Sequence, residues 1–118
     1  MKFEPKNISE GLIQCELYHR CREEGIEAYP EYYCKLDDGR GCRFDLVIIH
    51  DEEIIMIIEV KSRPKSYIPQ KGKQYQKYKQ TGLPVIYCTN LDMIEHTMNR
   101  IRVNLARRKQ IKNRKWKL

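Results

Sequence analysis

Apolar residues concentrate in two runs near the middle of the chain, 42–50 and 54–60. The acidic tripeptide Asp51-Glu52-Glu53 separates them. Short apolar runs that flank a polar turn are typical of neighbouring β-strands. The pattern therefore predicts a β-hairpin with a three-residue loop.

Helical and strand patterns surround this hairpin. Asn7 and Glu10 form a capping-box pattern that predicts a helix from Asn7 to Glu24, with Gly25 ending it. Its inward stripe is predicted to comprise Glu10, Ile13, Gln14, Leu17 and Cys21. The other predicted elements are an edge strand 31–36, a polar helix 70–80, a buried strand 85–89 and a helix from about 91 to 108 capped by Asn90. This order predicts an α/β sandwich around a mixed sheet, in which three strands form a meander and a fourth returns through a helix.

Three charged residues interrupt the apolar hairpin, which is a costly place for a charge. If the tripeptide forms the loop, Asp45 lies directly opposite Glu59, with Cβ atoms roughly 4.5–5.5 Å apart. Lys61 then projects from the same face. Facing carboxylates repel unless a cation lies between them, and Mg²⁺ accepts carboxylate, carbonyl and water oxygens. The alternative is a structural ion-pair network of Asp45, Glu59, Lys61 and Arg43.

Positive charge is concentrated at the C-terminal end of the chain. Residues 99–118 hold nine of the 23 basic residues and none of the 16 acidic ones, so the other residues are slightly acidic. A basic segment of this kind favours contact with a polyanion, and the alternative is a solvated tail. The residues assigned to nucleic-acid contact from this segment are Arg107, Arg108, Lys109, Lys112 and Arg114.

The five cysteines are odd in number and form no CxxC pair, as expected of free thiols in a reducing compartment. The pattern contains no secretory signal and no apolar run long enough to cross a bilayer. We therefore expect a cytoplasmic or nucleoid-associated protein that is not secreted and has no membrane partner.

The hairpin resembles the signature of the PD-(D/E)XK nucleases. Arg43-Phe44-Asp45 is followed, after thirteen residues, by Glu59-Val60-Lys61, although phenylalanine precedes the aspartate where many members have proline. Gln74 and Tyr78 resemble the QxxxY element of some branches. The resemblance extends from about Ile8 to Arg108 and implies one domain, 1–118, with a restriction-endonuclease-like αβββαβ(α) sandwich and a basic C-terminal helix and tail, about 91–118.

The resemblance implies Mg²⁺-dependent hydrolysis of a DNA phosphodiester, with Mn²⁺ as an alternative metal. Asp45, Glu59 and the carbonyl of Val60 would bind the metal. Lys61 would position or deprotonate the attacking water and stabilise the developing charge.

The resemblance also implies roles for residues outside the hairpin. Glu10 would contact metal-bound water, and its alternative is to act only as a helix cap. Gln74 and Tyr78 would hydrogen-bond near the metal or the DNA, and the alternative for Tyr78 is packing. We also assign Arg43 and Lys73 to nucleic-acid contact.

The expected protein is a small DNA endonuclease that acts as a homodimer or larger homo-oligomer on duplex or branched DNA. Enzymes of the Holliday-junction-resolving or homing type remain open. The competing hypotheses are a catalytically silent nucleic-acid-binding module of the same fold and a nuclease directed at RNA.

Overall fold

A four-stranded mixed sheet forms the centre of the protein. The computed structural model describes residues 1–2, 9–61 and 78–116, the last six of these as backbone. The strands are β1 (Ala28–Lys35), β2 (Gly41–His50), β3 (Glu53–Val60) and β4 (Val85–Cys88), in that order across the sheet. The pairs β1–β2 and β2–β3 are antiparallel and β3–β4 is parallel. The predicted α/β class, the meander and the returning fourth strand are confirmed.

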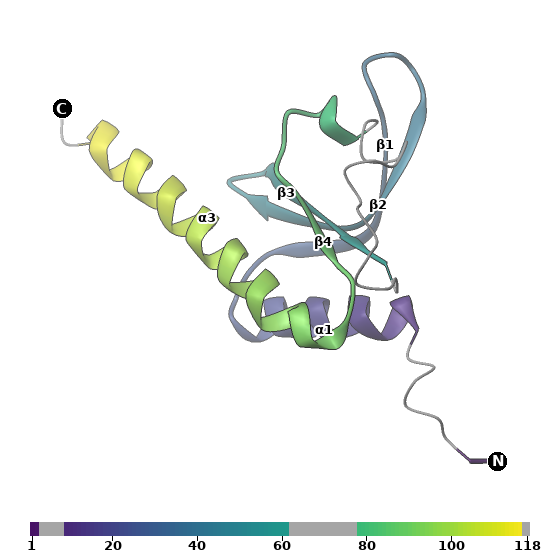
Figure 1. Ribbon diagram of the computed structural model, residues 1–118. Helices are drawn as coiled ribbons and strands as arrows, with labels where there is room; N and C mark the ends of the chain where they lie inside the picture. Colours follow the sequence, from purple (N-terminus) through teal and green to yellow (C-terminus); the bar gives the residue numbers. More distant parts are fainter. Residues whose placement is uncertain (3–8, 62–77, 117–118) are drawn as a thin grey trace.

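Two long helices cover one face of this sheet. They are α1 (Glu10–Glu23) and α3 (Ile94–Trp116), and a short 3₁₀ turn, η3 (Leu91–Met93), precedes the second. Figure 1 shows α1 lying across the base of the sheet next to the start of α3, while the C-terminal half of α3 extends away from the body. Within the described ranges, no helix has both the length and the apolar character needed to span a bilayer.

The sheet separates two apolar clusters. The helix-side cluster joins both helices to the sheet and contains Ile13, Leu17, Cys21, Leu46, Ile48, Ile55, Met56, Ile58, Val60, Ile86, Cys88, Ile94, Met98 and Ile101. The second cluster contains Leu36, Cys42, Phe44, Val47, Ile57 and Tyr78. Two-sided burial explains why β3 is an almost continuous apolar run.

The start of α1 differs from the prediction. Ser9 is the N-cap, and its side-chain oxygen accepts the Leu12 N–H at 3.3 Å. Glu10 is therefore the first helical residue instead of the third, and the predicted capping box is wrong; Asn7 itself lies outside the described residues. Asn and Ser are equally good caps, so the pattern alone did not separate them.

Strand and helix lengths also depart from the prediction at several ends. β1 begins at Ala28 and includes Pro30, which an edge strand tolerates because one side of its backbone has no partner strand. Asn90 caps the last helical segment as predicted, through a hydrogen bond from the Met93 N–H at 3.1 Å. α3 continues to Trp116, so the predicted end near residue 108 is wrong. Of the predicted helix 70–80, residues 70–77 lie outside the described part of the chain.

The hairpin turn is tighter than predicted. Asp51 and Glu52 form a two-residue turn with φ values of 48° and 67°, and Glu53 pairs with His50. The right-handed strand twist favours turns with two positive φ values. A register shift between Ile48 and Ile49 then restores the predicted pairing, so that Leu46 lies opposite Ile58. The loop prediction is wrong by one residue, but the register next to Asp45 is confirmed.

Leu17 is the most buried leucine of α1, with 0% of its surface exposed, and its removal tests the helix–sheet interface. We expect Leu17→Ala to lower the free energy of unfolding by about 2–5 kcal/mol, because the cavity adds to the lost apolar burial. Urea unfolding measures this change.

Leu12→Ala is the matched control, because Leu12 lies on the same helix and is 46% exposed. Its substitution should change the free energy of unfolding by no more than about 0.5 kcal/mol. Equal losses in the two variants would contradict the described orientation of α1.

Candidate active site

Two hydrogen bonds accepted by the Glu59 and Asp45 side chains join β2 to β3 at the point where the regular ladder between these strands ends. The last ladder pair before this point is Leu46 with Ile58. The Asp45 N–H then donates to Glu59 Oε1 at 3.1 Å, and the Val60 N–H donates to Asp45 Oδ2 at 2.9 Å. Side-chain oxygens therefore replace main-chain acceptors, and both carboxyl groups are held between the two strands.

The Glu59 carboxyl is buried, with 1% of the residue exposed. Burial, together with the hydrogen bond and the negative charge of Asp45, raises the pKa of Glu59 to about 8, while the charge of Lys61 opposes this shift. Glu59 therefore carries a proton at neutral pH. A cation bound between the carboxyl groups would stabilise the ionised form that the protein otherwise disfavours.

A local irregularity of β1 lies directly opposite Asp45. Glu31, between the paired residues Pro30 and Tyr32, has a φ of 55°, which is strained for a residue other than glycine. Gln14 on α1 donates through Nε2 to Glu31 Oε1 at 3.2 Å and to the main-chain oxygen of Asp45 at 2.9 Å. The Gln14 amide thus links α1 to the Glu31 side chain of β1 and to the main chain of Asp45 in β2.

The alternation of side chains between the two faces of β2 is interrupted at the same position. Strict alternation would place Phe44 and Leu46 on one face, yet Phe44 belongs to the second cluster and Leu46 to the helix-side cluster. The ring of Tyr78 packs edge-on against Phe44, with centroids 5.1 Å apart, and its hydroxyl donates to the Arg43 carbonyl at 3.1 Å. Tyr78 therefore contacts both the Phe44 ring and the Arg43 carbonyl, and so holds the main chain that leads into Asp45.

Tyr78 is 1% exposed and packs in the second cluster, and its contact with nucleic acid stays a prediction. Its hydroxyl also interacts with Glu59, which agrees with the predicted hydrogen bonding near the metal site. Burial also raises the pKa of the Tyr78 hydroxyl, which keeps that group as a hydrogen-bond donor. Arg43, the other assigned residue on this side, is exposed and pairs with Glu31 at 3.1 Å.

Lys61 follows β3 directly and is half-buried. Its main-chain N–H donates to the Cys88 carbonyl at 3.1 Å, which anchors the end of β3 to β4. The positive charge of Lys61 acts to lower the pKa of Glu59, so the ammonium lies near the carboxyl pair. The structure thus brings Asp45, Glu59 and Lys61 together, as the register predicted for the hairpin requires.

Gln14 is an α1 residue that hydrogen-bonds to the main chain of Asp45. Glu10 lies one turn earlier and is exposed. A role for Glu10 stays a prediction. The signal for Gln14 was present in the sequence, because it is a polar residue on a stripe that buries Ile13 and Leu17. No sequence pattern marked Glu31.

The basic residues assigned to nucleic acid lie mainly on α3. Arg107 and Lys109 are exposed, and Arg108 is half-buried with a hydrogen bond from Nε to Asn104 Oδ1 at 3.4 Å. Their contact with nucleic acid stays a prediction. Four assigned residues lie where side chains are not described: Lys73, Gln74, Lys112 and Arg114.

The carboxyl groups of Asp45 and Glu59 are the side chains of this site that could hold a metal ion. Within 9–61 and 78–110, no three His, Cys, Asp or Glu side chains come close enough to hold a metal ion. Mg²⁺ is compatible with such a site, because it keeps several waters and commonly takes only one or two carboxylates with substrate phosphate oxygens. The Val60 carbonyl stays a predicted further ligand.

Comparison with known proteins adds no independent identification. No family model, no curated protein and no solved structure matches this chain. The chemistry of the site is therefore argued from the residues themselves.

The raised pKa of Glu59 predicts how stability depends on pH. The folded protein binds a proton at Glu59 more tightly than the unfolded chain, whose pKa is near 4.5. The resulting stabilisation is complete below about pH 4.5 and is lost as the pH rises through about 8, by at most about 1.4 kcal/mol per pH unit. In Glu59→Gln this loss should be absent, so the variant gains stability relative to the wild type as the pH rises.

Urea unfolding in EDTA at several pH values between 5 and 8 measures the difference. Glu53→Gln is the matched control, because Glu53 is an exposed carboxylate at the other end of β3. If Glu59→Gln and the wild type follow parallel pH curves, Glu59 titrates as an ordinary carboxyl and the electrostatic description of the site is wrong.

Proposed function

We propose that this protein is a Mg²⁺-dependent nuclease that hydrolyses phosphodiester bonds, with a restriction-endonuclease-like fold of the PD-(D/E)XK type. The observation that supports the proposal is the adjacent Asp45 and Glu59 carboxyl groups, with Lys61 nearby, in an otherwise apolar part of the sheet. A purely structural ion pair would not require a second carboxyl with a raised pKa beside the first.

In this proposal Asp45 and Glu59 hold Mg²⁺, or Mn²⁺, between the ends of β2 and β3. The metal supplies charge neutralisation at the phosphate and lowers the pKa of water. Lys61 orients the attacking water and stabilises the negative charge that develops on the phosphate. Its position directly after Glu59 and Val60 lets the end of β3 present Glu59 and Lys61 beside Asp45 of β2.

Two further residues keep this site in place. Gln14 holds the main-chain oxygen of Asp45, and Tyr78 holds the main-chain oxygen of Arg43 two residues earlier. Both contacts act on the backbone, so they fix the direction of the Asp45 side chain without taking part in the chemistry. These are positioning residues in the proposal.

DNA is the proposed substrate, as duplex or branched DNA, and the proposed active form is a homodimer or larger homo-oligomer. One carboxyl pair per chain cuts one strand, so a concerted cut of both strands requires a second chain. The excess of basic residues on α3 supports a polyanionic substrate.

Cleavage assays test the proposed reaction. We expect Mg²⁺-dependent cleavage of at least one of four DNA substrates, namely supercoiled plasmid, linear duplex, branched DNA and single strand, and no cleavage in EDTA. Asp45→Asn and Lys61→Ala should lower the rate on the order of a hundredfold or more, because each removes charge stabilisation at the phosphate.

Glu53→Gln is the control for these variants and should cleave like the wild type. No metal-dependent cleavage of any DNA substrate, or full activity in Lys61→Ala, would refute the DNA nuclease. Cleavage of RNA alone under the same conditions would replace DNA with RNA as the substrate.

Metal binding can be measured separately from cleavage. Millimolar Mg²⁺ should raise the melting temperature of the wild type, because a ligand that binds only the folded state stabilises it. Asp45→Asn should abolish the shift, and Glu53→Gln should keep it. A metal-induced shift without cleavage of any nucleic acid would favour the silent binding module, and no shift in the wild type would contradict the metal site.

A further inference from the structure

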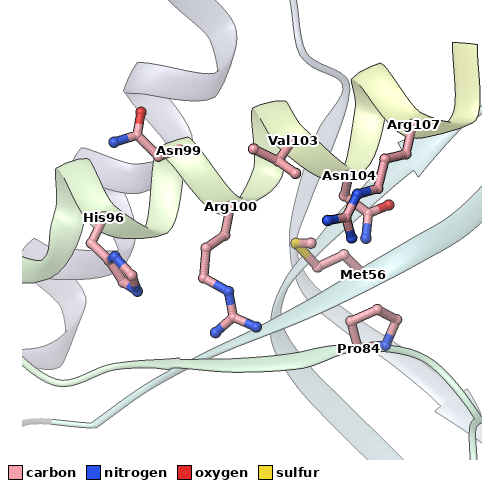
Figure 2. Close-up of a pocket in the computed structure, with 8 residues that line it drawn as sticks. All are labelled: Met56, Pro84, His96, Asn99, Arg100, Val103, Asn104 and Arg107. Atoms are coloured by element: carbon pink, nitrogen blue, oxygen red, sulfur yellow. The ribbon is translucent and has the colours of Figure 1, made fainter. Parts of the chain in front are cut away.

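A pocket of about 470 Å³ lies between α3 and the sheet, away from the carboxyl pair. Figure 2 shows basic side chains of α3 reaching along one side of it, over apolar residues of the sheet and the helix. The residues that matter here are His96, Arg100 and Arg107 on the helix, with Met56, Pro84 and Val103 below and between them.

The two arginines of this pocket are not neutralised by carboxylates. Neither Arg100 nor Arg107 forms an ion pair with a residue of the described ranges. Arg102, on another side of the same helix, is paired with Glu24 at 2.6 Å and with Glu95 at 2.9 Å. Because Glu24 and Glu95 pair with Arg102, they do not neutralise Arg100 and Arg107. The side of α3 that faces the pocket therefore keeps its positive charge.

The positions of the basic side chains indicate an extended ligand. From His96 to Arg107 the helix rises by eleven steps, a length of about 16 Å at 1.5 Å per step, and Arg100 lies between them. A single phosphate cannot contact both ends of such a row. Successive phosphates of a nucleic-acid strand advance by about 3.4 Å along a duplex axis and by more when the strand is stretched, so one short strand can reach the whole row.

The apolar residues of the pocket distinguish it from a flat basic surface. Val103 lies between the two arginines along α3 and is 49% exposed. Together with the exposed Pro84 it offers apolar contact to a flat ring above the buried Met56, and the volume is in the range of small-molecule sites. A duplex would present only its backbone here, whereas an unpaired strand can also insert a base.

The pocket and the carboxyl pair lie on different faces of β3. Met56 belongs to the helix-side cluster, and Ile57 belongs to the cluster of Tyr78. Glu59 shares the alternation of Ile57, so it faces away from α3. A ligand in the pocket therefore occupies a site separate from the proposed catalytic groups.

We propose that this pocket binds a segment of single-stranded nucleic acid, with its phosphates on Arg100 and Arg107 and one unstacked base against Val103 and Pro84. The inference goes beyond the proposed nuclease, because binding in the pocket requires neither the metal nor cleavage. Binding at this pocket without cleavage would support the pocket proposal and refute the proposed nuclease.

Fluorescence anisotropy with a labelled single-stranded oligonucleotide in EDTA tests the proposal. The double variant Arg100→Gln/Arg107→Gln should weaken binding on the order of tenfold or more and reduce the slope of log affinity against log salt by about 1.4, the value for two phosphate contacts of a single strand. Duplex of the same sequence should bind more weakly to the wild type and lose less affinity in the variant.

Arg22→Gln/Lys35→Gln is the matched control, because it removes the same charge from exposed positions on α1 and β1. Its affinity should stay within twofold of the wild type, as a rough bound for long-range charge alone. Equal weakening in both double variants would show general attraction and overturn the pocket. Duplex binding as tight as single-strand binding would overturn the single-strand assignment.

Val103→Glu adds a test of the apolar contact. Because Val103 is half exposed, the substitution should leave the melting temperature nearly unchanged while it weakens single-strand binding. Unchanged binding in this variant would show that the strand does not enter the pocket.

Discussion

The hydrogen bonding of the Asp45 and Glu59 side chains to the main chain between β2 and β3 is the constraint on which the rest of the structure depends. At this point β2 leaves β3, and two carboxyl groups take the place of main-chain acceptors. Neighbouring elements supply contacts that hold the main chain of β2 in this position. α1 supplies Gln14, and the residues before β4 supply Tyr78. The regular β-ladder is therefore interrupted at the site, and the surrounding elements stabilise this interruption.

This arrangement lowers stability, and the remainder of the sheet offsets that loss. A buried carboxyl with a pKa raised to about 8 opposes folding at neutral pH, as does the positive φ of Glu31. The offsetting contribution comes from Ile57 and Ile58, which are both fully buried although they face opposite sides of the sheet. Functional sites commonly break local rules in this way while the scaffold obeys them.

The sequence was informative wherever one periodicity ran without interruption. The register that places Asp45 opposite Glu59 was predicted from a three-residue loop, and it is confirmed at Leu46 with Ile58 because a register shift compensates for the shorter turn. The turn was predicted one residue too long, because a two-residue turn with positive φ and a compensating register shift leave no pattern in the residue types. Gln14 lies on the predicted inward stripe with Ile13 and Leu17, but it was passed over for Glu10 because the family resemblance implies an acidic helical residue. Glu31 was missed because its conformation comes from tertiary contacts alone.

The separation of the carboxyl pair from the pocket limits which substrates can use both. Met56 and Glu59 are three residues apart on β3, a distance of about 10 Å along the strand, and they face opposite sides of the sheet. One short strand cannot reach the two sites straight through a packed sheet. A nucleic acid held in the pocket must pass around an edge of the sheet or be cut by a second protomer. A long or branched molecule satisfies either route, so the pocket and a multimeric nuclease are compatible requirements.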